Sequence, residues 1–101
     1  MDEMQRMPMA AGVIGVDRGQ ARVNVTYNGR NGDLPDAVSF DLSDDIVRRI
    51  VAEALRTGGI PGIPADENPD LDGFVIDRFA ADEATPFNRA CVRPKATFGM
   101  P

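Results

Sequence analysis

The stretch that most constrains the fold runs from Ser43 to Gly59 and has the features of a single capped helix. Ser43 is a good N-cap, because its hydroxyl can accept a hydrogen bond from a free amide of the first turn. The two aspartates that follow it lie where the helix dipole favours negative charge. Gly58-Gly59 can adopt the left-handed conformation that commonly ends a helix. The pattern therefore predicts a helix from Asp44 to about Thr57.

Apolar side chains recur on one side of this helix, so that side needs a second layer of structure to cover it. On the polar side, Arg49 stands four residues after Asp45 and is well placed to form an ion pair with it. A twisted sheet with one apolar face is a layer that a lone helix can cover. The expected apolar stripe consists of Ile46, Val47, Ile50, Val51, Ala54 and Leu55.

Two runs of alternating apolar and polar residues precede the helix and predict β-strands. The first extends from Ala21 to Tyr27 and is rich in β-branched residues, and the second extends from Ala37 to Leu42. Two Asn-Gly pairs, Asn28-Gly29 and Asn31-Gly32, lie between them and readily adopt the positive φ angles of hairpin turns. The two runs together predict a β-hairpin with a longer-than-minimal loop.

The sequence after the helix predicts two further strands, Gly73 to Phe79 and Phe87 to Arg93, joined by a connection over Ala80 to Pro86. Ile60 to Gly73 is rich in proline and acidic residues and should form an irregular surface loop. The element order predicts an α+β fold in which a mixed sheet of four or five strands packs on one amphipathic helix. We expect a flexible leader over residues 1–11, one domain over 12–93 and an extended tail over 94–101.

Charge and composition argue against several classes of partner. The formal net charge is -5 and the basic residues are dispersed, which argues against binding to nucleic acid or to an anionic membrane. No apolar run approaches the roughly 20 residues that a membrane-spanning helix needs. Cys91 is the only cysteine and the start of the chain does not resemble an export signal, so the cytoplasm is the expected compartment.

The absence of histidine removes most catalytic and zinc chemistry from consideration. We therefore expect no enzymatic activity, no cofactor and no metal site. The acidic stretch from Asp66 to Asp72 has oxygen ligands at alternate positions, but Leu71 stands where an EF-hand loop needs glycine. A solvated acidic loop is the preferred interpretation there. Cys91 is interpreted as a small buried apolar residue, with a reactive thiol as the alternative.

The order of these elements resembles that of the ubiquitin-like β-grasp family. Residues 58–64, Gly-Gly-Ile-Pro-Gly-Ile-Pro, are similar to the Gly-Ile-Pro turn that follows the helix in ubiquitin. The resemblance extends over about four-fifths of the chain, from Ala21 to Gly99. It implies a β-grasp fold, with Ala21–Tyr27, Ala37–Leu42, Phe74–Phe79 and Phe87–Arg93 as strands and Ser43–Thr57 as the helix.

The same resemblance implies a function for the tail. Ubiquitin-like modifiers and sulfur carriers end in an extended tail that finishes in glycine, whose carboxylate is adenylated by an activating enzyme. Here Gly99 would be the attachment residue, although Met100-Pro101 follows it and the family's second glycine is absent. A trimming peptidase would first have to remove Met100-Pro101. Glycine suits this task because a tail without a Cβ can enter a narrow channel.

Five residues are candidates for contact with such partners, in the tail and on the polar side of the helix. The alternative for the helix arginines is a solvated surface, and the alternative for Phe98 is packing on the core.

The rival function of the chain is that of a non-conjugated β-grasp accessory subunit or adaptor in a larger protein complex, like the β-grasp subunits of multicomponent oxygenases. The contact residues would then bind a subunit of that complex. The candidate partner-binding residues are Arg93, Lys95, Phe98, Arg48 and Arg49.

Overall fold

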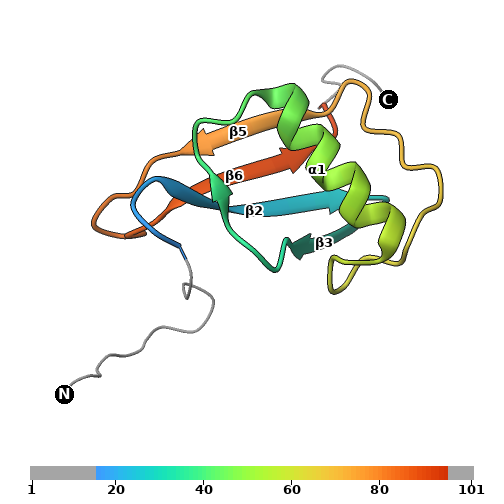
Figure 1. Cartoon of the computed structure of the whole chain (residues 1–101), viewed down its shortest axis with the longest axis horizontal. Coiled ribbons are helices and arrows are strands. Elements are labelled where there is room, and N and C mark those ends of the chain that lie inside the picture. The colour runs from blue at the N-terminus through green and yellow to red at the C-terminus, as the bar shows by residue number, and fades with distance from the viewer. Residues whose placement is uncertain (1–15, 96–101) are drawn as a thin grey trace.

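The computed structural model describes residues 16–95, in which one helix lies across one face of a mixed five-stranded sheet (Figure 1). The α+β class predicted from the sequence is therefore confirmed, and the arrangement is compatible with a β-grasp. The predicted leader over residues 1–11 and the tail residues 96–101 lie outside the described range. The elements are β2 (Gln20–Tyr27), β3 (Arg30–Asp33), β4 (Val38–Ser39), α1 (Asp44–Thr57), β5 (Val75–Phe79) and β6 (Asn88–Arg93).

A parallel pair of strands, β2 and β6, forms the centre of the sheet, whose order is β3-β2-β6-β5. In this pair Val23 lies in register with Ala90, and Val25 with Val92. β3 and β5 flank the pair in antiparallel orientation. Because parallel strands need a long crossover connection, the chain between β2 and β6 has room to place α1 over one face of the sheet.

The hairpin between β2 and β3 is tighter than the sequence predicted. It turns at Asn28 and Gly29, which have φ angles of 51° and 74°, as a two-residue hairpin turn requires. The predicted longer loop is therefore wrong. The second Asn-Gly pair lies inside β3, where Asn31 is in register with Thr26. The first pair reverses the chain because it follows β2 directly and supplies both positive φ angles.

The second predicted strand, Ala37 to Leu42, is reduced to the two residues of β4, which pair with the start of β2. The returning chain is interrupted between β3 and β4, where Leu34 turns into the core and Pro35 has no amide to donate to a ladder. After β4 the chain turns towards α1, and Leu42 packs against the core from a half-buried position. The arm of the hairpin that returns along β2 therefore consists of two short strands, β3 and β4, instead of one long strand.

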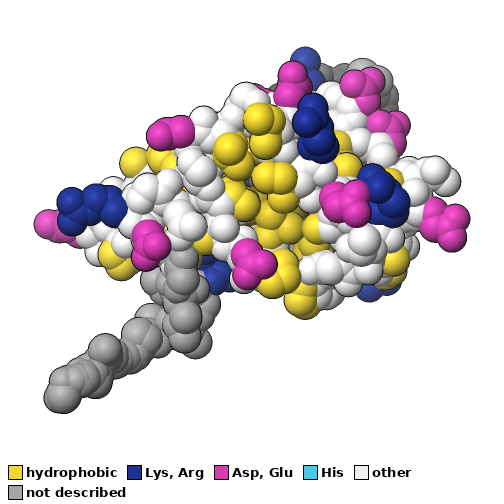
Figure 2. Space-filling view, in the orientation of Figure 1, with side chains coloured by type: hydrophobic (Ala, Val, Ile, Leu, Met, Phe, Trp, Pro, Cys, Tyr) yellow, Lys and Arg dark blue, Asp and Glu magenta, His cyan; other side chains and the backbone are white. Residues whose placement is uncertain are grey.

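The predicted helix is confirmed at both ends. The Ser43 hydroxyl accepts a hydrogen bond from the Ile46 amide at 3.3 Å, and Gly58 ends the helix in the left-handed conformation with φ 72°. Its buried face is narrower than predicted, because Ile46 is 40% exposed. Figure 2 shows hydrophobic side chains at the surface on this side of the molecule, among charged ones. The predicted Asp45–Arg49 ion pair is also wrong: Asp45 instead accepts a hydrogen bond from Arg48, one turn along the helix, at 2.9 Å.

The core lies between α1 and the sheet, and the segment after the helix completes it. Residues 58–73 are irregular, as predicted, but three of their apolar side chains are buried, which corrects the expectation of a surface loop. These three side chains, Ile60, Ile63 and Leu71, cover the part of the apolar sheet face that α1 leaves open. The buried residues are Val23, Val25, Tyr27, Leu34, Val47, Val51, Leu55, Ile60, Ile63, Leu71, Ala90 and Val92.

The acidic segment from Asp66 to Asp72 is stabilised by hydrogen bonds to its own carboxylates. The Tyr27 hydroxyl donates to Asp66 Oδ2 at 2.7 Å and accepts a hydrogen bond from the Asp70 amide at 3.2 Å. Asp66 Oδ1 also accepts from the Asn68 amide at 3.0 Å. Within residues 16–95, no three histidine, cysteine or acidic side chains gather in a way that could hold a metal ion. These carboxylates therefore have a structural use in shaping the loop.

Replacing Tyr27 with phenylalanine should make the protein less stable in a pH-dependent way. The hydrogen bond from the Tyr27 hydroxyl, and to a smaller extent that from the Asn68 amide, holds the pKa of Asp66 below its usual 3.8. The Tyr27–Asp66 hydrogen bond therefore stabilises the fold above that pH, and this stabilisation is lost as pH falls. The hydrogen bond to the Asp66 carboxylate is the main reason why the pKa of Tyr27 is raised above its usual 10.0. The stabilisation by this hydrogen bond is therefore also lost in strong alkali, where Tyr27 ionises. The stability difference between the two proteins should be largest between these limits in urea titrations. A difference that did not change with pH would contradict this account.

Candidate functional site

The chain leaves the described fold at the end of β6, beside the start of β5. Arg93, the last residue of β6, lies in register with Val75, the first residue of β5. Pro94 and Lys95 follow and are exposed. The predicted attachment residue Gly99 and the predicted contact residue Phe98 lie outside the described residues. The root of the predicted tail is therefore a central strand that is hydrogen-bonded on both sides.

The Arg93 side chain links the end of β6 to the edge strand β5. Its Nε donates to Asp77 Oδ2 of β5 at 2.7 Å, on the face of the sheet opposite α1. Both side chains are partly exposed, so the pair should contribute no more than about 1 kcal/mol to stability. Its main effect is to fix where the chain leaves the sheet. Lys95, by contrast, is exposed and forms no ion pair within residues 16–95.

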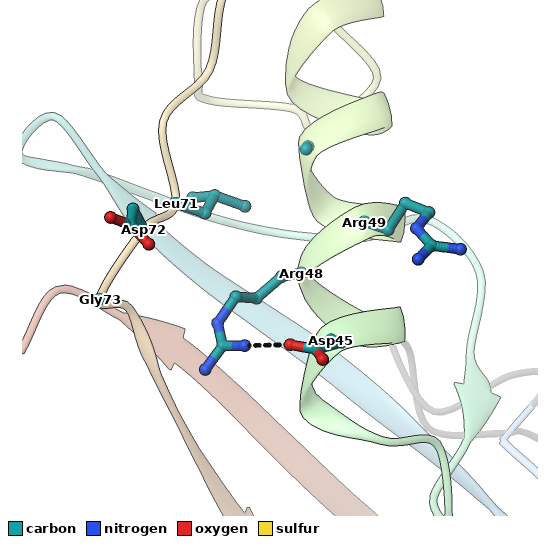
Figure 3. Close-up of a pocket in the computed structure, with 7 residues that line it drawn as sticks. Asp45, Arg48, Arg49, Leu71, Asp72 and Gly73 are labelled. Atoms are coloured by element: carbon teal, nitrogen blue, oxygen red, sulfur yellow. Dashed lines mark hydrogen bonds and ion pairs between the residues drawn. The ribbon is translucent and has the colours of Figure 1, made fainter.

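Arg48 joins α1 to the segment that leads into β5. Its Nε donates to the Phe74 carbonyl at 3.2 Å, and its Nη1 donates to Asp45 Oδ1 at 2.9 Å. Arg49 is exposed and leaves the helix in a different direction (Figure 3). Arg48 therefore has a structural role, whereas Arg49 is open to a partner.

An open depression of about 530 Å³ lies between α1 and the segment that follows it (Figure 3). Its charged residues balance, with two arginines and two aspartates, and the Arg48 donors are partly engaged. It therefore lacks the convergent free polar groups of a small-molecule site. The lining residues are Asp45, Arg48, Arg49, Ala52, Leu71, Asp72 and Gly73.

The structure brings three of the predicted contact residues to one end of the molecule. Arg48 holds the Phe74 carbonyl from the helix side, and Arg93 lies beside the next residue, Val75, on the other face. Lys95 follows two residues later along the chain. The start of β5 is thus held from both faces of the sheet, next to the point where the tail begins.

The sequence interpretation missed the open face of the sheet, opposite α1. There a depression of about 350 Å³ is lined by side chains of β2, β3 and β6 together with Phe87. The alternation of Arg89, Cys91 and Arg93 with buried Ala90 and Val92 is a signal that could have indicated this polar face. The parallel neighbour of β6 is not encoded in that local pattern. The lining residues are Arg22, Asn24, Asp33, Phe87, Arg89 and Cys91.

Two titrating groups on this face have shifted pKa values. Burial alone would raise the pKa of Asp33, but hydrogen bonds from Asn24 and Arg22 outweigh it and leave that pKa lowered. Burial raises the pKa of the Cys91 thiol, which is half-buried, not fully buried as predicted. The Cys91 thiol therefore stays neutral near pH 7, while Asp33 stays charged and engaged with its partners.

Comparison with known proteins assigns this chain to no group. No family model, no curated protein and no solved structure matches it. The helix α1, the one helix among residues 16–95, is neither long nor apolar enough to cross a membrane.

Proposed function

We propose that this chain is a ubiquitin-like β-grasp protein that acts as a modifier or carrier through its C-terminal tail. The path of β6 is the observation that carries the proposal. This strand is paired with β2 on one side and β5 on the other, and it leads directly into exposed Pro94 and Lys95. A tail that starts from such a strand is anchored at its root, so its further residues can enter the site of another protein.

In this proposal the chemistry belongs to the partners. A peptidase removes the residues that follow Gly99, Met100 and Pro101 in this sequence, and frees the Gly99 carboxylate. That carboxylate attacks the α-phosphate of ATP in an activating enzyme and displaces pyrophosphate. A thiolate then attacks the acyl adenylate, displaces AMP and forms a thioester. The chain itself supplies no catalytic group, cofactor or metal, and its place of action would be the cytoplasm.

The contact residues divide by their surroundings. Lys95 and Arg49 are exposed and form no ion pair within residues 16–95, so they are the described residues that best suit contact with the activating enzyme. Arg48 and Arg93 support the root of the tail through their bonds to Phe74 and Asp77. Phe98 would complete the contact from within the tail.

Mass spectrometry of the protein isolated from its native host tests this proposal. We expect a chain that ends at Gly99, together with adducts in which Gly99 is joined to another molecule. A Gly99→Val variant should form no adducts, whereas an Ala96→Ser variant should form them normally. Recovery of the chain only in a form that continues beyond Gly99, without adducts, would overturn the proposal.

The second candidate function is the non-conjugated accessory subunit or adaptor. The observation that favours it is the open face of the sheet, which offers a binding surface that does not involve the tail. Removal of residues 96–101 separates the two candidates. An adaptor should keep its place in its complex after this truncation, whereas a modifier should lose all conjugation.

A further inference from the structure

We infer that the open face of the sheet binds an acidic side chain of a partner protein, which pairs with Arg89 and packs an apolar neighbour against Phe87. This surface goes beyond the proposed tail chemistry and does not depend on it. The inference starts from the register of the two central strands. Arg22 of β2 lies directly beside Arg89 of β6, and both are on the face away from α1.

Like charges at directly opposed positions of neighbouring strands are unfavourable unless each is compensated. Arg22 is compensated, because its Nη2 donates to Asp33 Oδ2 of β3 at 2.6 Å. Arg89 pairs with no carboxylate among residues 16–95. Arg93, on the same face, is compensated by Asp77. Among the described residues of this face, Arg89 is therefore the arginine whose charge no carboxylate compensates.

Packing, not an acceptor, holds the Arg89 side chain. Its guanidinium carbon lies 4.9 Å from the centre of the Phe79 ring, on the neighbouring strand β5. Its Nε is buried and has no hydrogen-bond partner within the described part of the chain. An unmade hydrogen bond of this kind is unfavourable, and a carboxylate is the acceptor that a guanidinium binds best. Arg89 thus has the charge for an acidic ligand. Because its Nε is buried, the donors that a carboxylate can reach are its Nη groups, which donate no hydrogen bond within residues 16–95.

The surroundings of Arg89 favour a single carboxylate over a polyanion. The Asp33 carboxylate is already engaged with Arg22 and Asn24, and the Cys91 thiol is neutral, so neither competes strongly for Arg89. Phe87 gives the depression an apolar wall, which suits the neighbour of an acidic residue in a peptide. The net charge of -5 opposes the approach of nucleic acid. A glutamate or aspartate beside an apolar residue is therefore the occupant that fits.

Nuclear magnetic resonance of the full ¹⁵N-labelled chain tests this inference. The probe is the peptide acetyl-Gly-Leu-Glu-Leu-Gly-amide, and its control carries Gln in place of Glu. We expect the acidic peptide to move the Arg89 Nε–H signal in a saturable way and to bind severalfold more tightly than the control. Arg89→Gln should lose this difference, Arg89→Lys should keep part of it, and Arg56→Gln, on the helix side, should keep all of it.

Three results would overturn the inference. One is the absence of a saturable shift with the acidic peptide, in a sample whose backbone spectrum shows a folded chain. Another is an equal response to the two peptides, which would show that the carboxylate is not recognised. The third is a tighter response to inorganic phosphate or to a short oligonucleotide, which would point to a different class of ligand.

Discussion

Replacing Gly32 with alanine should destabilise the fold by about 1–3 kcal/mol, because the new methyl group has no space. A Cβ at this position would overlap the carbonyl oxygen of Pro61 and lie 2.8 Å from Cγ2 of Ile60. A backbone oxygen cannot rotate away as a flexible side chain can. Either β3 or the segment after the helix must therefore shift, and that segment places Ile60 in the core.

Urea unfolding followed by circular dichroism would measure this loss as a lower midpoint with an unchanged slope. Gly19→Ala is the matched control, because no atom lies within 4 Å of a Cβ built at Gly19. Its effect should stay within about 0.5 kcal/mol. If the two variants were equally stable, the close approach of β3 to Pro61 would be wrong.

Replacing Leu55 with alanine should cost more, about 2–5 kcal/mol. Leu55 is 1% exposed and lies in the last turns of α1, within the cluster that joins the helix to the sheet. The loss combines the removal of buried apolar surface with the cavity that remains. Because small domains are stable by only about 5–15 kcal/mol, the variant should be marginal or partly unfolded at 37 °C.

Ile46→Ala provides the comparison on the same helix. Ile46 is 40% exposed, so its truncation should cost less than about 1 kcal/mol. Thermal unfolding of both variants at one protein concentration would show the contrast as a much larger fall in midpoint for Leu55→Ala. Equal falls would mean that Ile46 is as buried as the helical periodicity predicted, and that the narrower apolar face is wrong.

The elements that depend on neighbouring residues could be predicted from the sequence. The bounds of α1 follow from the Ser43 cap and the left-handed Gly58, which act within one turn of the helix ends. The hairpin was harder to predict, because two Asn-Gly pairs offer the same turn chemistry. The structure uses Asn28-Gly29 as the turn, whereas Gly32 meets Pro61, a contact that no local pattern contains.

The candidate site was accessible to prediction only in part. Arg48 and Arg93 were identified as contact residues, but their partners Phe74 and Asp77 come from other elements and give both arginines a structural role. The opposition of two arginines on the open face depends on the parallel register of β2 and β6, strands from opposite ends of the fold. Gly99 and Phe98 remain predictions from the sequence resemblance.

The pairing of β2 with β6 has a consequence for how the protein is made. These are the first and last of the described strands, so the centre of the sheet cannot form until nearly the whole domain has been synthesised. Until then one edge of β2 lacks its permanent neighbour, although Val23 and Val25 can already pack against α1, which is made before β6. Folding that waits for such distant contacts is slow compared with folding from local ones. The centre of the sheet should therefore form only after β6 has left the ribosome, late in the synthesis of the domain.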